Sequence, residues 1–238
     1  MVSGTGILPR RTKETSKSGD HGDDKEHGRP HNRAVTLYHD GSRRYQDRFD
    51  TRRLADRIDD RLVRPTIDDD DRAFIEGCDM VFVATADADG KPQCSYKGGE
   101  PGFVRVLDER TVVFPNYDGN GMFLTAGNAL VNPHIGLLFI DFRQRKRLRL
   151  NGIATHSDDD PLLAEYPEAQ FLWRVEATEV FPNCPRYIHH YELVERSRFV
   201  PRAECKTPVP AWKTREWAND VLAADDPAKE SNAEIVDR

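Results

Sequence analysis

TVVFPNYDGNGMFLTAGNALVNPHIGLLFIDFRQRKRLRLNG, residues 111–152, is the stretch of sequence that decides the fold. Its first residues, 111–115, form an apolar run closed by a proline, which predicts a buried strand. Residues 116–121 predict a turn, because glycine and asparagine tolerate positive φ where most residues do not. Apolar residues at helical spacing then predict a helix over 122–131, and a second apolar run predicts a core strand over 135–140.

The end of this stretch, residues 143–151, is strongly basic. In a strand, alternation would place Arg145, Arg147, Arg149 and Asn151 on one face, with Leu148 and Leu150 on the other. A row of like charges is unfavourable unless an anion or several carboxylates lie opposite, so this face is compatible with a phosphate site. The alternative is a solvated edge strand, kept basic to discourage edge-to-edge aggregation, and composition alone favours that alternative.

Composition narrows the function classes. Charged residues make up 32% of the 238 residues and hydrophobic residues only 37%, so part of the chain is expected to lie outside the core. The net charge of −6 argues against a general nucleic-acid-binding protein. The chain has no apolar run long enough for a signal peptide or a membrane span. The cysteines are widely spaced and predict reduced thiols in a cytoplasmic protein; they are Cys78, Cys94, Cys184 and Cys205.

The ends of the chain differ from its middle. Residues 1–33 predict a disordered polar arm, whose His21, His27 and His31 are interpreted as solvated rather than as a loose metal-binding tract. The expected folded domain is 34–200. Prolines and charges return over 201–238, which predicts a loosely docked tail, although its two tryptophans, Trp212 and Trp217, indicate that part of it packs.

Helices are expected before the first strand. Apolar residues recur every four or five positions and predict two short helices; they are Tyr45, Phe49, Leu54, Ile58 and Leu62. The pair Asp50-Thr51 offers an N-cap between the two helices, and Pro65 ends the second. The four aspartates of 68–71 are interpreted as the start of a further helix over 72–77 rather than as a divalent metal site.

Strand signals then dominate. Strands are predicted over 80–86, 92–97, 103–107 and 170–181, in addition to those within 111–152. About seven short strands with one inserted helix predict a mainly β fold with helical flanks, an antiparallel barrel.

Several phrases in this order resemble one family. They are DADGKPQCSYKGG at 87–99, TVVFPNYDGNGM at 111–122, IGLLFID at 135–141 and RLRLNG at 147–152. Together they resemble the pyridoxamine 5′-phosphate oxidase-related proteins, over roughly residues 40–200. The resemblance implies an antiparallel split β-barrel, a homodimer that binds FMN at the subunit interface, and a small-molecule substrate. The net charge predicts no nucleic-acid partner, and the lack of a long apolar run predicts no membrane association.

The resemblance also implies which residues contact the cofactor. The strand ending in lysine supplies Gln93, Cys94, Ser95, Tyr96 and Lys97, and the next strand end supplies Phe114, Pro115 and Asn116. The basic strand supplies Arg147 and Arg149. The turn supplies Asn120, Gly121 and Met122, which stand where the family archetype has an Arg-Lys pair for the flavin phosphate. Lys97, Arg147, Arg149 or the backbone N–H groups at the helix start would then hold the phosphate.

The archetype's substrate-binding arginine-histidine motif is replaced here by PRYIHH at 185–190. The resemblance therefore supports FMN as the cofactor more strongly than it supports pyridoxamine phosphate as the substrate. Tyr117 and Tyr187 are candidates for substrate stacking, with ordinary packing as the favoured alternative, and His189 is a candidate for proton transfer. We expect an FMN-dependent oxidoreductase. The alternatives are a non-catalytic module that binds or senses a flavin, deazaflavin or haem, and an anion-binding or nucleic-acid-binding protein that uses 143–149, which the net charge makes least favourable.

Overall fold

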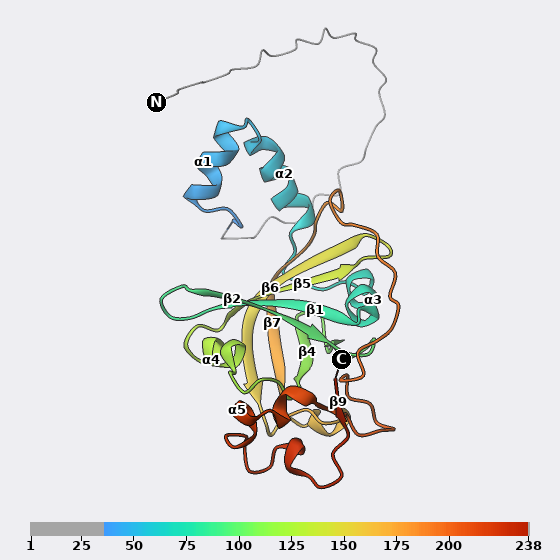
Figure 1. Cartoon of the computed structure of the whole chain (residues 1–238). Coiled ribbons are helices and arrows are strands. Elements are labelled where there is room, and N and C mark those ends of the chain that lie inside the picture. Colours follow the sequence, from blue (N-terminus) through green and yellow to red (C-terminus); the bar gives the residue numbers. More distant parts are fainter. Residues whose placement is uncertain (1–35, 238) are drawn as a thin grey trace, which may run out of the picture.

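A computed structural model describes residues 36–237, and a seven-stranded antiparallel sheet forms its body (Figure 1). The strand order is β2-β1-β5-β6-β7-β4-β3. The strands are β1 (Met80–Ala86), β2 (Pro92–Gly98), β3 (Arg105–Val106), β4 (Thr111–Asn116), β5 (His134–Asp141), β6 (Lys146–Ser157) and β7 (Phe171–Pro182). The predicted mainly β fold with helical flanks is confirmed. The predicted arm 1–33, with His21, His27 and His31, lies outside the described residues.

The chain also forms short helices and 3-10 turns. They are α1 (Asp40–Arg48), α2 (Arg52–Leu62), α3 (Asp69–Gly77), α4 (Leu124–Val131), α5 (Glu216–Asn219) and the 3-10 turns η1 (Leu163–Glu165), η2 (Ala211–Thr214) and η3 (Pro227–Lys229). Asp68 and Asp71 form a reciprocal capping box at the start of α3, so the aspartate run starts a helix as expected. The helix begins at Asp69, three residues before the predicted start.

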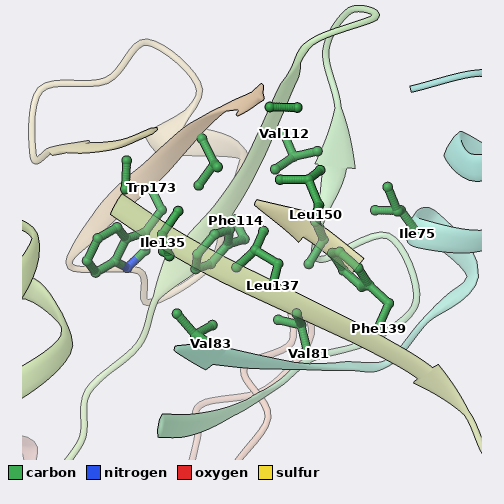
Figure 2. Close-up of a cluster of buried hydrophobic side chains, with 14 of the residues drawn as sticks. Ile75, Val81, Val83, Val112, Phe114, Ile135, Leu137, Phe139, Leu150 and Trp173 are labelled. Carbon is green, nitrogen blue, oxygen red and sulfur yellow. The ribbon is translucent and has the colours of Figure 1, made fainter. Parts of the chain in front are cut away.

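Side chains of the sheet, α3 and α4 form the core, and Figure 2 shows a part of it. Alternation along the strands places one side chain in two inside, as in the pair Val81 and Val83 of β1. Phe114 of β4 stacks on Trp173 of β7 with ring centroids 5.8 Å apart, and both are fully buried. Each such side chain contributes roughly 1.5–3 kcal/mol to folding through burial.

The basic segment lies inside the sheet. β6 pairs with β5 on one side and with β7 on the other, so the edge-strand interpretation was wrong. Leu148 and Leu150 share one face of the strand as predicted, and that face is buried. Arg145, however, has φ of 54° and belongs to the turn before the strand, where the Asp141 carboxylate accepts backbone N–H groups. The predicted charged face therefore loses Arg145, because the hairpin turn takes up the first basic residues.

β6 and β7 slip by one residue at Gly152, where β7 carries the extra residue Thr178. A Cβ at Gly152 would lie 2.4 Å from the carbonyl oxygen of Glu176. Only glycine allows the two strands to approach this closely, and the bulge keeps β6 paired beyond it.

The helices α1 and α2 stand away from the sheet (Figure 1). Both lie where the apolar periodicity predicted them, and Thr51 is the N-cap residue of α2. Their apolar stripe is nevertheless exposed, from 38% at Ile58 to 65% at Phe49.

The C-terminal segment, which we define as residues 207–236, is ordered beside the sheet. Its two-residue strands β8 (Val209–Pro210) and β9 (Ile235–Val236) pair in parallel. Trp212 and Trp217 stack on each other with ring centroids 5.9 Å apart. The backbone N–H of Thr207 donates to Glu168 at 2.9 Å, which ties the segment to the body.

Candidate functional site

A narrow cleft of about 130 Å³ opens where β2, the end of β4 and the start of α4 meet. Alternation along β2 points Gln93, Ser95 and Lys97 to the same side, and this side faces the cleft. Its other lining residues are Asn116, Tyr117, Gly119, Asn120, Gly121, Met122, Phe123, Leu124, Thr125, Ala126 and Gln170. Seven of the predicted cofactor residues therefore lie together; they are Gln93, Ser95, Lys97, Asn116, Asn120, Gly121 and Met122.

A polar network joins β2 to the first turn of α4 inside this cleft. The hydroxyl oxygens of Ser95 and Thr125 lie 3.1 Å apart. Both hydroxyls also lie near Oε1 of Gln93, at 3.2 Å from Ser95 and 3.3 Å from Thr125. Thr125 is buried and was not predicted from the sequence, although a hydroxyl in the first turn of a helix after a glycine-rich turn is a usable signal.

The start of α4 leaves backbone donors open. Its N-cap residue, Phe123, has φ of 47° and makes no side-chain capping hydrogen bond. The first N–H groups of a helix have no partner within the helix, and they carry the positive end of its dipole. The eight-residue α4 therefore presents an anion-binding end to the cleft.

Lys97 adds a positive charge to the narrow cleft. No hydrogen bond or ion pair of its ammonium group occurs within residues 36–237. Burial lowers its pKa, because desolvation disfavours the charged form. A half-buried ammonium group beside an open helix start is the arrangement that a bound anion would stabilise.

A wider cleft of about 860 Å³ adjoins the narrow one, and Lys97, Tyr117 and Gly119 line both. Its volume is in the usual range for small-molecule sites. Its aromatic walls come from α3, the loop after β2, the β5–β6 turn and the strap of residues 191–200; they include Phe74, Phe103, Phe142, Tyr191 and Phe199. Burial raises the pKa of Tyr117 to about 12, so its phenol is neutral at pH 7 and is able to donate a hydrogen bond.

Other predicted cofactor residues lie elsewhere. Cys94 is exposed, and Tyr96 lies against Phe82 with ring centroids 5.8 Å apart. Tyr96 and Pro115 line the wide cleft rather than the narrow one. The side chain of Phe114 is fully buried in the core, which leaves only its backbone available to a ligand.

The two arginines of β6 line neither cleft of this chain. Arg147 donates to Oδ1 of Asn183 at 2.7 Å and to the carbonyl oxygen of Cys184 at 2.6 Å. Arg149 lies over the Phe181 ring, with its guanidinium carbon 5.9 Å from the centroid. Arg147 thus ties down the loop after β7.

Of the three residues predicted to contact the substrate, one lines the clefts and two do not. Tyr117 lies between the two clefts, as described above. Tyr187 is 82% exposed, and the ring of His189 packs against Tyr191 at 6.2 Å between centroids. Neither Tyr187 nor His189 lines either cleft.

Residues 36–237 lack two kinds of feature. These residues contain no group of three or more histidine, cysteine or acidic side chains placed to hold a metal ion. In the same part of the chain, no helix has the length and apolar character needed to cross a membrane.

Comparisons with known proteins bear on residues 67–184, which match the family model of pyridoxamine 5′-phosphate oxidase. No curated protein matches the chain. A solved structure of HupZ from Group A Streptococcus is 18% identical, with a TM-score of 0.41, over 49% of this chain and 93% of that one.

Two further solved structures are similar. A putative pyridoxamine 5′-phosphate oxidase from Lactobacillus delbrueckii is 22% identical, with a TM-score of 0.41, over 50% of this chain and 95% of that one. HutZ, the haem storage protein from Vibrio cholerae, is 19% identical, with a TM-score of 0.36, over 49% of this chain and 94% of that one. The family model and the antiparallel sheet together show that this chain belongs to the pyridoxamine 5′-phosphate oxidase-related family and has its mainly β split-barrel fold.

Proposed function

We propose that the two clefts bind FMN and that the protein is a flavin-dependent oxidoreductase acting on a small organic molecule. The observation that carries this proposal is Lys97, a half-buried cation that has no counter-ion among residues 36–237 and lies in a cleft that also receives the open end of α4. Family membership supports the same cofactor. A phosphate dianion would match the Lys97 ammonium group and the backbone N–H groups of α4, because hydrogen bonds to charged groups are stronger than those between neutral groups.

The narrow cleft suits the phosphate end of FMN. The backbone N–H groups of α4 and the Lys97 ammonium group would bind its oxygens, and the hydroxyls of Ser95 and Thr125 would add donors. A volume of about 130 Å³ is too small for the whole cofactor, because ligand sites of drug size occupy roughly 300–1,000 Å³. The ring system would therefore extend past Lys97 and Tyr117 into the wide cleft.

The wide cleft would hold the ring and the substrate. Bound FMN supplies the hydride or electron transfer, and the protein supplies placement and electrostatics. The aromatic walls orient flat molecules and exclude water. The neutral phenol of Tyr117, placed between the clefts, would donate a hydrogen bond to whatever lies beside it.

A homodimer is part of this proposal. Arg147 and Arg149 lie away from the clefts of their own chain, so they would reach a cofactor only across a subunit interface. The helix α4 offers an apolar surface for such an interface, with Leu130 75% exposed and Val131 61% exposed. Burying that surface between two copies would stabilise the dimer by about 25 cal/mol for each Å² of apolar area.

The proposal is tested by cofactor titration. The purified chain is titrated with FMN, a deazaflavin and haemin, and flavin fluorescence and absorbance spectra are recorded. We expect micromolar or tighter FMN binding, bleaching of the bound flavin by dithionite, and reoxidation by air. Reduction by NADH or NADPH would identify the electron donor.

Two results would change the conclusion. FMN bound tightly without turnover against any donor or oxygen would favour the non-catalytic binding module. Haemin or deazaflavin bound in preference to FMN would refute the cofactor assignment.

A further inference from the structure

Lys213 in η2 is only 2% exposed, which is unusual for a lysine unless its charge is paired. Its Nζ donates to Oδ2 of Asp118 at 2.6 Å and to Oδ2 of Asp226 at 2.8 Å. Burial alone would lower its pKa, but hydrogen bonds to both carboxylates outweigh burial and raise the pKa. The charged ammonium group is thus held between two carboxylates, Asp226 of the C-terminal segment and Asp118 of the body.

Asp118 belongs to the loop that forms one wall of the clefts. We call residues 117–122 the cofactor loop; its members Tyr117 and Gly119 line both clefts. Within the described residues, one hydrogen bond ties this loop to a segment distant in sequence, and it is the Asp118–Lys213 bond, which spans 95 residues. The other hydrogen bonds of the loop are local, from Asn116 and within the loop itself.

The loop needs such support because of its backbone. Gly121 has φ of 73° and Phe123, immediately after the loop, has φ of 47°. A bulky residue in the left-handed region is unfavourable, and surrounding contacts must hold it there. This strained turn sets where α4 begins and where its N–H groups point.

The C-terminal segment is built to provide this support. Val209 and Ala218 are buried. The Asp226 carboxylate accepts hydrogen bonds from Lys213 Nζ and from the Ala228 backbone N–H, the latter at 2.9 Å. Lys213 is therefore fixed from its own side before it contacts Asp118.

We infer that Lys213 is a positioning residue for the cofactor loop, so that the C-terminal segment governs ligand retention in the narrow cleft. It does so in two ways. It fixes the loop through Asp118, and it neutralises a carboxylate flanked by two cleft residues, which would otherwise repel a phosphate. The inference rests on the proposed function for its ligand, but its effect on the loop is measurable without one.

The test compares Lys213→Met with the wild-type chain by two measurements. Hydrogen exchange of the ligand-free chain reports the opening of residues 117–122, and fluorescence titration reports FMN affinity. We expect faster exchange in the cofactor loop and about tenfold weaker FMN binding. The double variant Asp118→Asn/Lys213→Met should recover part of the affinity, because the unpaired carboxylate is gone. Lys213→Arg, which keeps the charge, should bind FMN nearly as well as the wild type.

The matched control is Lys206→Met, which breaks the ion pair between Lys206, the residue just before the C-terminal segment, and Glu230 within it. It should change neither loop exchange nor FMN affinity. If Lys213→Met does not fold, Asp118→Ala gives the same loop measurement, because it removes the acceptor on the loop and leaves Lys213 paired with Asp226.

The outcomes separate the positioning role of Lys213 from its neutralising role. Unchanged loop exchange, or faster exchange confined to residues 207–236, would overturn the positioning role. Failure of Asp118→Asn to recover affinity in the double variant would overturn the neutralising role. Faster loop exchange in a protein whose wild-type form does not bind FMN would support Lys213 as the positioning residue and refute the proposed cofactor.

Discussion

Replacing Lys97 with methionine should have opposite effects on stability and on cofactor binding. In the ligand-free protein the half-buried ammonium group has no counter-ion within residues 36–237, and its lowered pKa reflects that desolvation. Methionine has a similar length and no charge, so Lys97→Met should stabilise the ligand-free fold by about 1 kcal/mol. For a chain of this size that corresponds to a rise in Tm of roughly 2–4 °C.

The same change should weaken FMN binding. A hydrogen bond between charged groups contributes about 1.5–3 kcal/mol, and about 1.4 kcal/mol is tenfold in affinity. Lys97→Met should therefore raise the Kd for FMN by roughly 10- to 150-fold. Lys97→Arg should retain most of the affinity, because the charge remains. Lys91→Met, on the same hairpin but 77% exposed and paired with Asp89, is the neutral control.

The pH dependence of both effects follows from the lowered pKa of Lys97. A lysine whose pKa is lower in the folded state destabilises the fold where it is charged, so the gain in Tm should be largest at neutral pH and vanish above pH 10.5, the ordinary value. FMN affinity of the wild type should fall as the pH rises through the lowered pKa, and Lys97→Met should lack that fall. Thermal scans and fluorescence titrations from pH 7 to 11 measure both. Equal FMN affinity in the two proteins, or a lower Tm in the ligand-free variant, would refute the reasoning.

Three further changes test other parts of the structure. Gly152→Ala should lower the free energy of unfolding by about 1–3 kcal/mol in urea denaturation, because its Cβ meets the Glu176 carbonyl; an unchanged midpoint would contradict the bulge geometry. Arg147→Glu should abolish FMN retention on gel filtration while the circular dichroism of the sheet persists, and unchanged retention would remove this arginine from the site. Asp160→Asn should cost about 1–3 kcal/mol at pH 7 by breaking the hydrogen bonds from Arg174, which lower the pKa of Asp160 below 3.8. That difference should persist at all pH values above 3.8 and disappear as the pH falls through the lowered pKa, and a difference independent of pH would count against the assignment.

The strands of the sheet were predicted from the alternation of apolar and polar residues, which depends only on neighbouring residues in the sequence. Alternation and apolar runs placed β1 at its observed bounds and predicted that Leu148 and Leu150 share one face of their strand, which the structure buries. The neighbours of a strand are not a local property, and this is why the edge-strand interpretation of the basic segment was wrong. The position of the hairpin turn was also missed, so Arg145 was assigned to the strand face.

The helices show the same limit. Apolar spacing predicted α1 and α2 but contained no information on what covers their stripe. The start of α4 was predicted two residues early, because Phe123 adopts a left-handed conformation that no residue pattern favours there.

The candidate site was predicted where residues lie on one strand or in one turn. Gln93, Ser95 and Lys97 share a face of β2. The residues of the turn after β4 were predicted from the family resemblance, and they line the same cleft. Thr125 and Lys213 were missed, because their roles depend on contacts between segments that lie far apart in the sequence.

The separation between Asp118 and Lys213 also sets an order of assembly. All seven strands of the main sheet have been synthesised once the chain reaches Pro182, whereas the partner of Asp118 comes later. Domains form as their residues emerge from the ribosome, so the barrel strands are complete before the ammonium group that pairs with Asp118 has been synthesised. Under the proposed function, FMN loading would then be the last step in maturation, and a nascent chain arrested before residue 213 would be a folded precursor without its cofactor.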